Sequence, residues 1–155
     1  MLGVKVAGKI MKIMKILKLV SYYFFSLANG FATSSLIPQP LRWLMLKPWA
    51  PGISRCSLGA GVKLMGRNVR IGRGAFINVG CVIGDGAVIG QNVSLGPYVI
   101  ASTQHHDDAY PIKRAGSTRW QPVIIGAGSW IGGGRSSTRV SPSASSRSLV
   151  PVRWC

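Results

Sequence analysis

The residues best suited to chemistry stand together in one polar stretch, 101–122. His105 and His106 are the two histidines of the chain, and two of its three acidic residues, Asp107 and Asp108, follow directly. An imidazole titrates near neutral pH, so it can take a proton as a general base. A lone histidine is usually structural or merely exposed, but an adjacent pair in one long insertion is a candidate catalytic site.

The stretch interrupts a repeat of six residues, and this repeat must position it. Between 71 and 100 an aliphatic residue recurs every six positions, with a small or branched apolar residue two places before it. Alternate side chains of a strand point to opposite faces, so both positions of each hexad are expected to point inward. The aliphatic set is Ile71, Ile77, Ile83, Ile89 and Leu95, and the smaller set is Val69, Ala75, Cys81, Ala87 and Val93.

A short fixed period of this kind predicts a parallel β-helix, an all-β solenoid. The glycine that follows most of the aliphatic residues is expected to supply unusual backbone angles at the corners. The solenoid is predicted over 53–134, with Leu58 and Leu64 in an imperfect first turn. After the insertion, Val123, Ile125 and Ile131 resume the register.

The hexads resemble those of the bacterial hexapeptide-repeat acyltransferases, in particular the galactoside and maltose O-acetyltransferases and a polysaccharide-modifying branch. Asn78 and Cys81, then Gly96-Pro97, then the His105-His106 pair follow the order of that family's motifs. The resemblance implies a left-handed three-sided β-helix, a homotrimer, and acetyl-CoA as co-substrate. It also implies that His106 removes a proton from a saccharide hydroxyl as the oxygen attacks acetyl-CoA directly. One gap in the alignment would move this role to His105.

The resemblance implies roles for other residues as well. The Trp130-Ile131-Gly132 motif puts an oxyanion donor at the Gly133 N–H, with Trp130 and Gly132 beside the pantetheine arm; the alternative for Trp130 is an ordinary corner residue of the prism. Asn78 and Asp85 match positions near the acceptor sugar, although both are also ordinary turn residues. Charge alone suggests contacts to the coenzyme A phosphates, and solvated loop charges explain the same residues equally well. These residues are Lys113, Arg114 and Arg119.

The region before the repeat, 1–52, is predicted to be helical and basic. Lys5, Lys9, Lys12 and Lys15 line one side of a helix over 1–20, which fits either a membrane surface or packing against protein. A second apolar helix is expected over 19–37; the uncharged run 19–41 is long enough to cross a bilayer, but polar residues and prolines dilute it. A further short helix is expected over 41–46.

The net charge and the cysteine content indicate which partners and which cellular compartment to expect. The formal net charge is +16, which suggests an anionic partner, and no nucleic-acid motif accompanies it. The three cysteines, Cys56, Cys81 and Cys155, form no disulfide framework. We therefore expect a cytoplasmic protein, free or held at the inner face of the membrane, with no nucleic-acid partner.

The last segment, 135–155, is Ser- and Arg-rich and lacks the hexads, which is typical of an irregular tail. A sharper hypothesis is a frameshift. Back-translated with suitable codons and shifted by one base, the segment reads AILNPGVTIGELAVVGAGSVV, a continuation of the repeat. The chain as written would then lack at least three hexads, and we expect it to be unstable or poorly active.

Two classes of function remain after these arguments. The first is an O-acetyltransferase that acts on an exopolysaccharide or lipopolysaccharide unit. The second is a non-catalytic hexapeptide-repeat scaffold or a decayed gene product. A carbonic anhydrase of similar fold would need three metal-binding histidines and the chain has two, so no metal is expected.

Overall fold

A computed structural model of the chain describes residues 2–108, 115–134 and 136–137, with side chains in 9–107 and 115–134. Two helices precede a stack of short strands. The helices are α1 (Leu2–Ala32) and α2 (Gln39–Leu46). The strands are β1 (Ser57–Leu58), β2 (Lys63–Leu64), β3 (Arg70–Ile71), β4 (Phe76–Ile77), β5 (Val82–Ile83), β6 (Val88–Ile89), β7 (Ser94–Leu95), β8 (Ile100–Ala101), β9 (Gln104–Asp108), β10 (Ala115–Trp120), β11 (Ile124–Ile125), β12 (Trp130–Ile131) and β13 (Ser136–Ser137).

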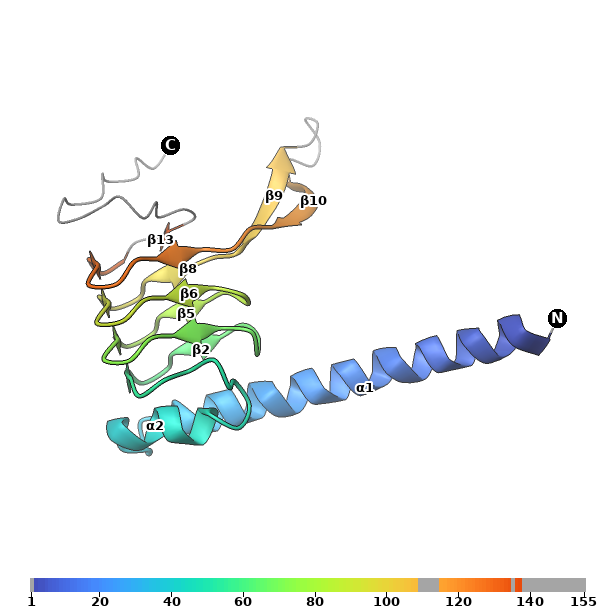
Figure 1. The fold of residues 1–155 in the computed structure, drawn as a ribbon, viewed down its shortest axis with the longest axis horizontal. Helices are drawn as coiled ribbons and strands as arrows, with labels where there is room; N and C mark the ends of the chain where they lie inside the picture. The colour runs from blue at the N-terminus through green and yellow to red at the C-terminus, as the bar shows by residue number, and fades with distance from the viewer. Residues whose placement is uncertain (1, 109–114, 135, 138–155) are drawn as a thin grey trace.

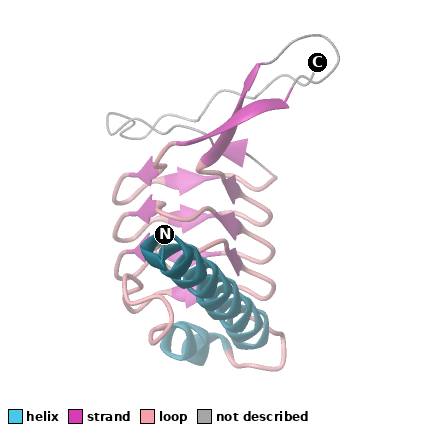
Figure 2. Ribbon diagram, turned by 90° about the vertical axis from the view of Figure 1, so that its right-hand side faces the viewer, coloured by secondary structure: helices cyan, strands magenta, loops and turns pink. Residues whose placement is uncertain are grey.

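The short strands form three parallel sheets that the chain visits in rotation. Sheet I has the order β1-β4-β7-β12, sheet II β2-β5-β8-β13 and sheet III β3-β6-β11. Each strand pairs with the strand one turn further along, for example Ile77 with Leu95. The stacked rungs are visible in Figures 1 and 2. The arrangement is compatible with the predicted β-helix-like repeat.

The inward positions of the hexads form the core, as predicted. The five aliphatic residues from Ile71 to Leu95 are at most 1% exposed, and so are the smaller residues that precede them by two. Leu58 and Leu64 in the first turn and Val123, Ile125 and Ile131 after the insertion are buried as well. The alternation of the strand backbone is a local property, which is why the sequence alone identifies this core.

The role expected for the glycines after the aliphatic residues was wrong. Positive φ angles occur two positions later, for example at Gly74 and Gly86. The glycines themselves stand where neighbouring turns meet. A Cβ on Gly96 would lie 2.4 Å from the backbone nitrogen of Gly133 in the next turn. These positions therefore need glycine because of close backbone approach.

The N-terminal region contains two helices, one fewer than expected. The predicted helices over 1–20 and 19–37 are one continuous helix, α1, which ends at Ala32. The segment is rich in Lys, Leu, Met and Ala, which favour helix, and it contains no proline. Helix α2 follows Pro38, with Pro40 in its first turn, where a missing N–H costs nothing. No helix among the described residues is both long and apolar enough to cross a membrane.

Side chains from both helices close the open edge of the first turn. Asn29 is 4% exposed, and its side chain accepts a hydrogen bond from the Leu64 N–H (2.7 Å) and donates one to the Val62 carbonyl (3.0 Å). Arg42 donates from Nη1 to the Leu58 carbonyl at 2.9 Å. These groups would otherwise be unpaired on the first strands of sheets I and II. The helices therefore cap the coil.

Two cysteines are buried as free thiols, which agrees with the core position expected for Cys81. Burial raises the pKa of the Cys56 thiol to about 12 and also raises the pKa of Cys81. Both therefore stay protonated and unreactive at neutral pH.

The coil extends slightly further than predicted. Strand β13, Ser136–Ser137, pairs with β8, so the regular part reaches Ser137, three residues beyond the expected boundary at Gly134. The hypothesis of a frameshift product concerns 135–155, which otherwise lies outside the described residues. Lys113 and Arg114, the suggested coenzyme A contacts, also lie outside them.

Candidate functional site

The predicted catalytic insertion is an antiparallel hairpin made of β9 and β10. His106 is paired with Thr118 and His105 with Arg119, and a bulge follows between Ala115 and Thr118. The hairpin leaves the coil after β8 and projects away from the stack (Figure 1). The N–H of Gln121 donates to the carbonyl of Thr103 at 2.8 Å and closes its base. The histidines therefore stand on a paired strand instead of an irregular loop.

His106 is exposed on one face of the hairpin. Its Nδ1 lies 3.4 Å from the carbonyl oxygen of Gly116 and 3.5 Å from the hydroxyl of Thr118. A carbonyl oxygen only accepts hydrogen bonds, so this contact favours the tautomer with the proton on Nδ1. In that tautomer Nε2 carries the lone pair. Because the ring is exposed, this lone pair can accept a proton from a substrate.

His105 points to the opposite face, as alternation in a strand requires. Its Nε2 is buried and has no hydrogen-bond partner among the described residues. A ring nitrogen that is covered in this way cannot reach a substrate without a rearrangement. Of the two histidines, His106 therefore has the geometry that a general base needs.

Asp107 also faces away from His106. Its carboxylate accepts a hydrogen bond from the Ser117 hydroxyl at 2.7 Å and forms an ion pair with Arg119, where Nε and Oδ1 are 2.6 Å apart. The bond from Ser117, and then the bond and charge of Arg119, lower the pKa of Asp107. Within the chain, Asp107 is thus a partner of Arg119 and orders the hairpin; it does not orient the His106 ring.

This ion pair bears on the role suggested for Arg119. Arg119 was a candidate for the coenzyme A phosphates on charge alone, and its Nε is committed to Asp107. The side chain is still 68% exposed. The pair lowers the net positive charge that this face offers to a phosphate.

A second group of the expected site residues lies at another corner of the coil. The corner between sheets I and II contains Asn78, then Gly96-Pro97 one turn above, then Gly132 and Gly133. The Gly134 N–H donates to the Pro97 carbonyl at 2.8 Å, so the last two levels are in contact. The Gly133 N–H donates to no acceptor among the described residues, as an oxyanion donor requires.

Trp130 stands beside this corner on the outer face of sheet I. Its side chain is 73% exposed, and one turn below it the outward position is occupied by Ser94. Exposure of this extent shows that Trp130 is not packed against the other described residues. Asn78 uses its side-chain oxygen to accept a hydrogen bond from the N–H of Val79, a turn role that occupies this oxygen.

Asp85 lies below the hairpin, at the corner between sheets II and III. Both oxygens of its carboxylate accept hydrogen bonds from Asn68 in the preceding turn, one from the backbone N–H (2.9 Å) and one from Nδ2 (3.0 Å). The carboxylate thus ties two turns together. This geometry gives Asp85 a structural role in the single chain.

The single chain therefore brings together only part of the expected site. The hairpin with His106 starts from the corner between sheets II and III, whereas Gly133 and Trp130 belong to the corner between sheets I and II. Sheet II separates the two corners. Among the described residues, no hydrogen bond or ion pair joins the hairpin to the Gly133 corner.

Sequence reasoning missed the residues that support the histidine. In the sequence, nothing distinguishes Gly116, Ser117 and Thr118 from the other residues of the polar segment. Their roles arise because β10 pairs with β9. The sequence contains one weak indication of a hairpin: two polar segments of similar length flank 109–114. The bulge in β10 makes the register hard to deduce without the structure.

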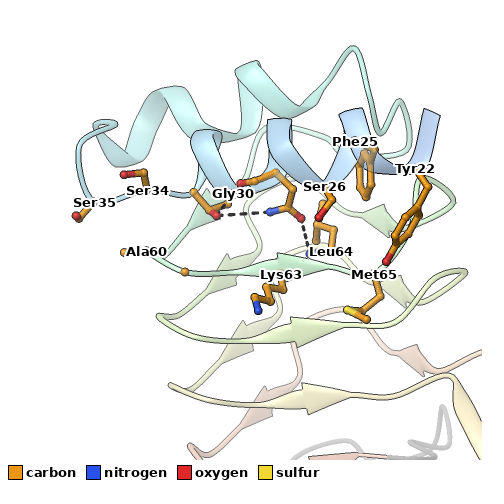
Figure 3. A pocket seen from close by; sticks show the side chains of 13 residues that line it. Tyr22, Phe25, Ser26, Gly30, Ser34, Ser35, Ala60, Lys63, Leu64 and Met65 are labelled. Atoms are coloured by element: carbon orange, nitrogen blue, oxygen red, sulfur yellow. Dashed lines mark hydrogen bonds between the residues drawn. The ribbon is translucent and has the colours of Figure 1, made fainter. Parts of the chain in front are cut away.

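Two grooves in the described structure lie away from the hairpin. One, of about 630 Å³, lies between α1 and residues 60–65; Figure 3 shows Phe25 and Tyr22 on one side and Lys63 and Met65 on the other. The second, of about 450 Å³, lies between α2 and 55–57. Within the described residues, no three His, Cys, Asp or Glu side chains are grouped as a metal site would require.

Comparison of the chain with models of protein families, with curated proteins and with solved structures gives no match.

Proposed function

We propose that the chain is built as an O-acetyltransferase that moves an acetyl group from acetyl-CoA to a saccharide hydroxyl of an exopolysaccharide or lipopolysaccharide unit. The observation that carries the proposal is the environment of His106. Its ring is exposed on the hairpin while Nδ1 faces the Gly116 carbonyl at 3.4 Å, a contact that favours the proton on Nδ1 and the lone pair on Nε2. The resemblance of the hexads to hexapeptide-repeat acyltransferases supplies the reaction.

In the proposed reaction, Nε2 of His106 takes the proton of the hydroxyl as its oxygen attacks the thioester carbonyl. The C–S bond then breaks, and the thiolate of coenzyme A receives the proton from the imidazolium. Such a base contributes by making a weakly acidic hydroxyl nucleophilic at neutral pH. The Gly133 N–H would hold the developing oxyanion, because a preorganised donor stabilises charge that appears only in the transition state.

The proposal includes a left-handed coil that assembles as a homotrimer. It is supported by the separation of the His106 hairpin from the Gly133 corner on each chain. In a ring of copies, the hairpin of one chain would meet Trp130 and Gly133 of the next, and the exposed Trp130 would pack on the pantetheine arm. Buried, protonated thiols at Cys56 and Cys81 fit the cytoplasmic setting that acetyl-CoA requires.

The test is transfer of label from acetyl-CoA to a panel of saccharide acceptors. We expect His106→Ala to abolish transfer, with its circular dichroism spectrum unchanged. His105→Ala is the matched control and should keep most of the activity, because its Nε2 is covered. The assay is run on the chain as written and on a chain with the hexads of the neighbouring frame restored.

Two results would reject the assignment. Equal activity in His106→Ala and the parent would remove His106 as the base. Absence of both transfer and acetyl-CoA hydrolysis in the frame-restored chain would favour the alternative, a non-catalytic scaffold.

A further inference from the structure

Helix α1 carries an apolar stripe that no other part of the described structure covers. Seven apolar residues follow one another at alternating spacings of three and four, which places them along one side of the helix. Each is between 44% and 61% exposed. The stripe consists of Ile10, Ile13, Leu17, Val20, Phe24, Leu27 and Phe31.

The stripe differs from the side of α1 that packs on the coil. The buried residues of the helix are Phe25, Asn29 and Ala32, whose spacing of four and three defines a separate face. Residues 9–20 are exposed throughout, and Figure 1 shows α1 lying across the end of the coil and continuing well beyond it. A continuous exposed apolar surface of this length marks an interaction site.

The charge of α1 indicates which kind of partner binds the stripe. Lys9, Lys12, Lys15 and Lys18 alternate with the apolar residues of the exposed half, and α1 contains no acidic residue. Packing of the stripe against a second copy would leave these lysines, which lie on the flank and the far side of the helix, with no acidic partner on either helix. An anionic surface would bind the lysines and the apolar stripe at once.

We propose that α1 binds an anionic membrane surface, with the stripe in the headgroup and acyl-chain boundary and the ammonium groups of the flanking Lys9 and Lys12 at the lipid phosphates. Lysine side chains reach outward from a helix in this position along their methylene stems. Membrane binding needs both the stripe and the lysines. Burial of the apolar stripe holds the helix on the bilayer, and the lysines select anionic lipid.

The order of the strands in sheet II gives the distance of the hairpin from α1 along the stack. Asn29 joins α1 to β2, and the hairpin follows β8, which lies two strands above β2 in sheet II. Neighbouring strands are about 4.8 Å apart, so the hairpin starts roughly 10 Å above the level of β2. The proposal itself rests on α1 alone and is independent of the acetyltransferase activity.

The test is co-sedimentation of the full chain with lipid vesicles. We expect binding to vesicles of phosphatidylcholine mixed with phosphatidylglycerol and little binding to phosphatidylcholine alone, with a loss of binding as salt is raised. Leu17→Gln should weaken binding about tenfold or more, because one buried leucine is lost. Leu19→Gln is the matched control: it lies two positions, about 200°, further round the helix and should change binding little.

The lysines are tested in the same way. The double substitution Lys9→Gln with Lys12→Gln, the two lysines that flank the stripe, should weaken binding to the anionic vesicles, and Lys63→Gln, an exposed lysine on the coil, should not. Light scattering of each variant reports the mass of the assembly. Equal binding to both kinds of vesicle would overturn the proposal. So would a lack of vesicle binding together with a lower mass for Leu17→Gln, which would assign the stripe to a second copy.

Discussion

Arg119 and Asp107 face each other across the β9–β10 hairpin, with 2.6 Å between the Arg119 Nε and the Asp107 Oδ1. Ser117 donates to the other carboxylate oxygen. The pair lies on the face of the hairpin opposite His106, since alternate residues of a strand point to opposite sides. It therefore holds the two strands in register while His106 stays accessible.

The first prediction concerns the pH dependence of this hairpin. The pKa of Asp107 is lowered, mainly by the hydrogen bond from Ser117 and then by Arg119. A carboxyl group with a lowered pKa in the folded state stabilises that state above its ordinary pKa, and the contribution is lost as pH falls through the lowered value. We expect amide protection in β9 and β10 to fall in acid before protection in the coil does.

Hydrogen exchange or NMR titration measures this effect. Ser117→Ala should raise the pKa of Asp107 towards its ordinary value, because the largest cause of the shift is removed. Thr118→Val, whose hydroxyl faces His106, is the matched control and should leave the pKa unchanged. An unchanged pKa in Ser117→Ala would show that the bond does not form in solution.

The second prediction concerns the cap on the first turn. Asn29→Ala leaves the Leu64 N–H and the Val62 carbonyl without their side-chain partner in a buried position. An unsatisfied buried group costs about 1–3 kcal/mol, so we expect a loss of about 3 kcal/mol in the free energy of unfolding. Urea denaturation measures it. Ser26→Ala, at an exposed position of the same helix, should change the stability by less than about 0.5 kcal/mol.

The third prediction separates two reasons for glycine in the coil. Gly96→Ala places a methyl group 2.4 Å from the backbone nitrogen of Gly133, so two turns must move apart. Gly128→Ala meets nothing within 4 Å and suffers only from its φ of +71°. We expect Gly96→Ala to lower the free energy of unfolding by about 3 kcal/mol and Gly128→Ala to lower it by about 1 kcal/mol. Thermal unfolding measures both losses. Equal losses would mean that the turns are not in close contact at Gly96.

The fourth prediction follows from the frameshift hypothesis. Restoring the hexads of the neighbouring frame after Gly134 adds at least one full turn, and in a solenoid each turn is stabilised by the one above it. We expect Tm to rise by about 5 °C or more in circular dichroism. A control chain with serine at the restored aliphatic positions should show no rise. Sequencing of the DNA after codon 134 tests the origin of the tail directly.

The sequence by itself determined the core of this protein. The six-residue period identified every inward residue from Val69 to Leu95, because alternation along a strand is a local property that needs no knowledge of the partner strand. The same reasoning located the insertion and its histidines. It could not assign the reason for glycine at Gly96, since close approach between turns depends on residues distant in sequence.

Only the tertiary structure decided how the polar groups are paired. The contact of His106 with Gly116, the ion pair of Asp107 with Arg119, and the cap formed by Asn29 each join segments ten or more residues apart. Side-chain hydrogen bonds require positions within about 3.5 Å, and a sequence pattern of one element does not specify such distances. For the same reason, only the stacking of the turns shows that His106 and Gly133 lie at different corners of the coil.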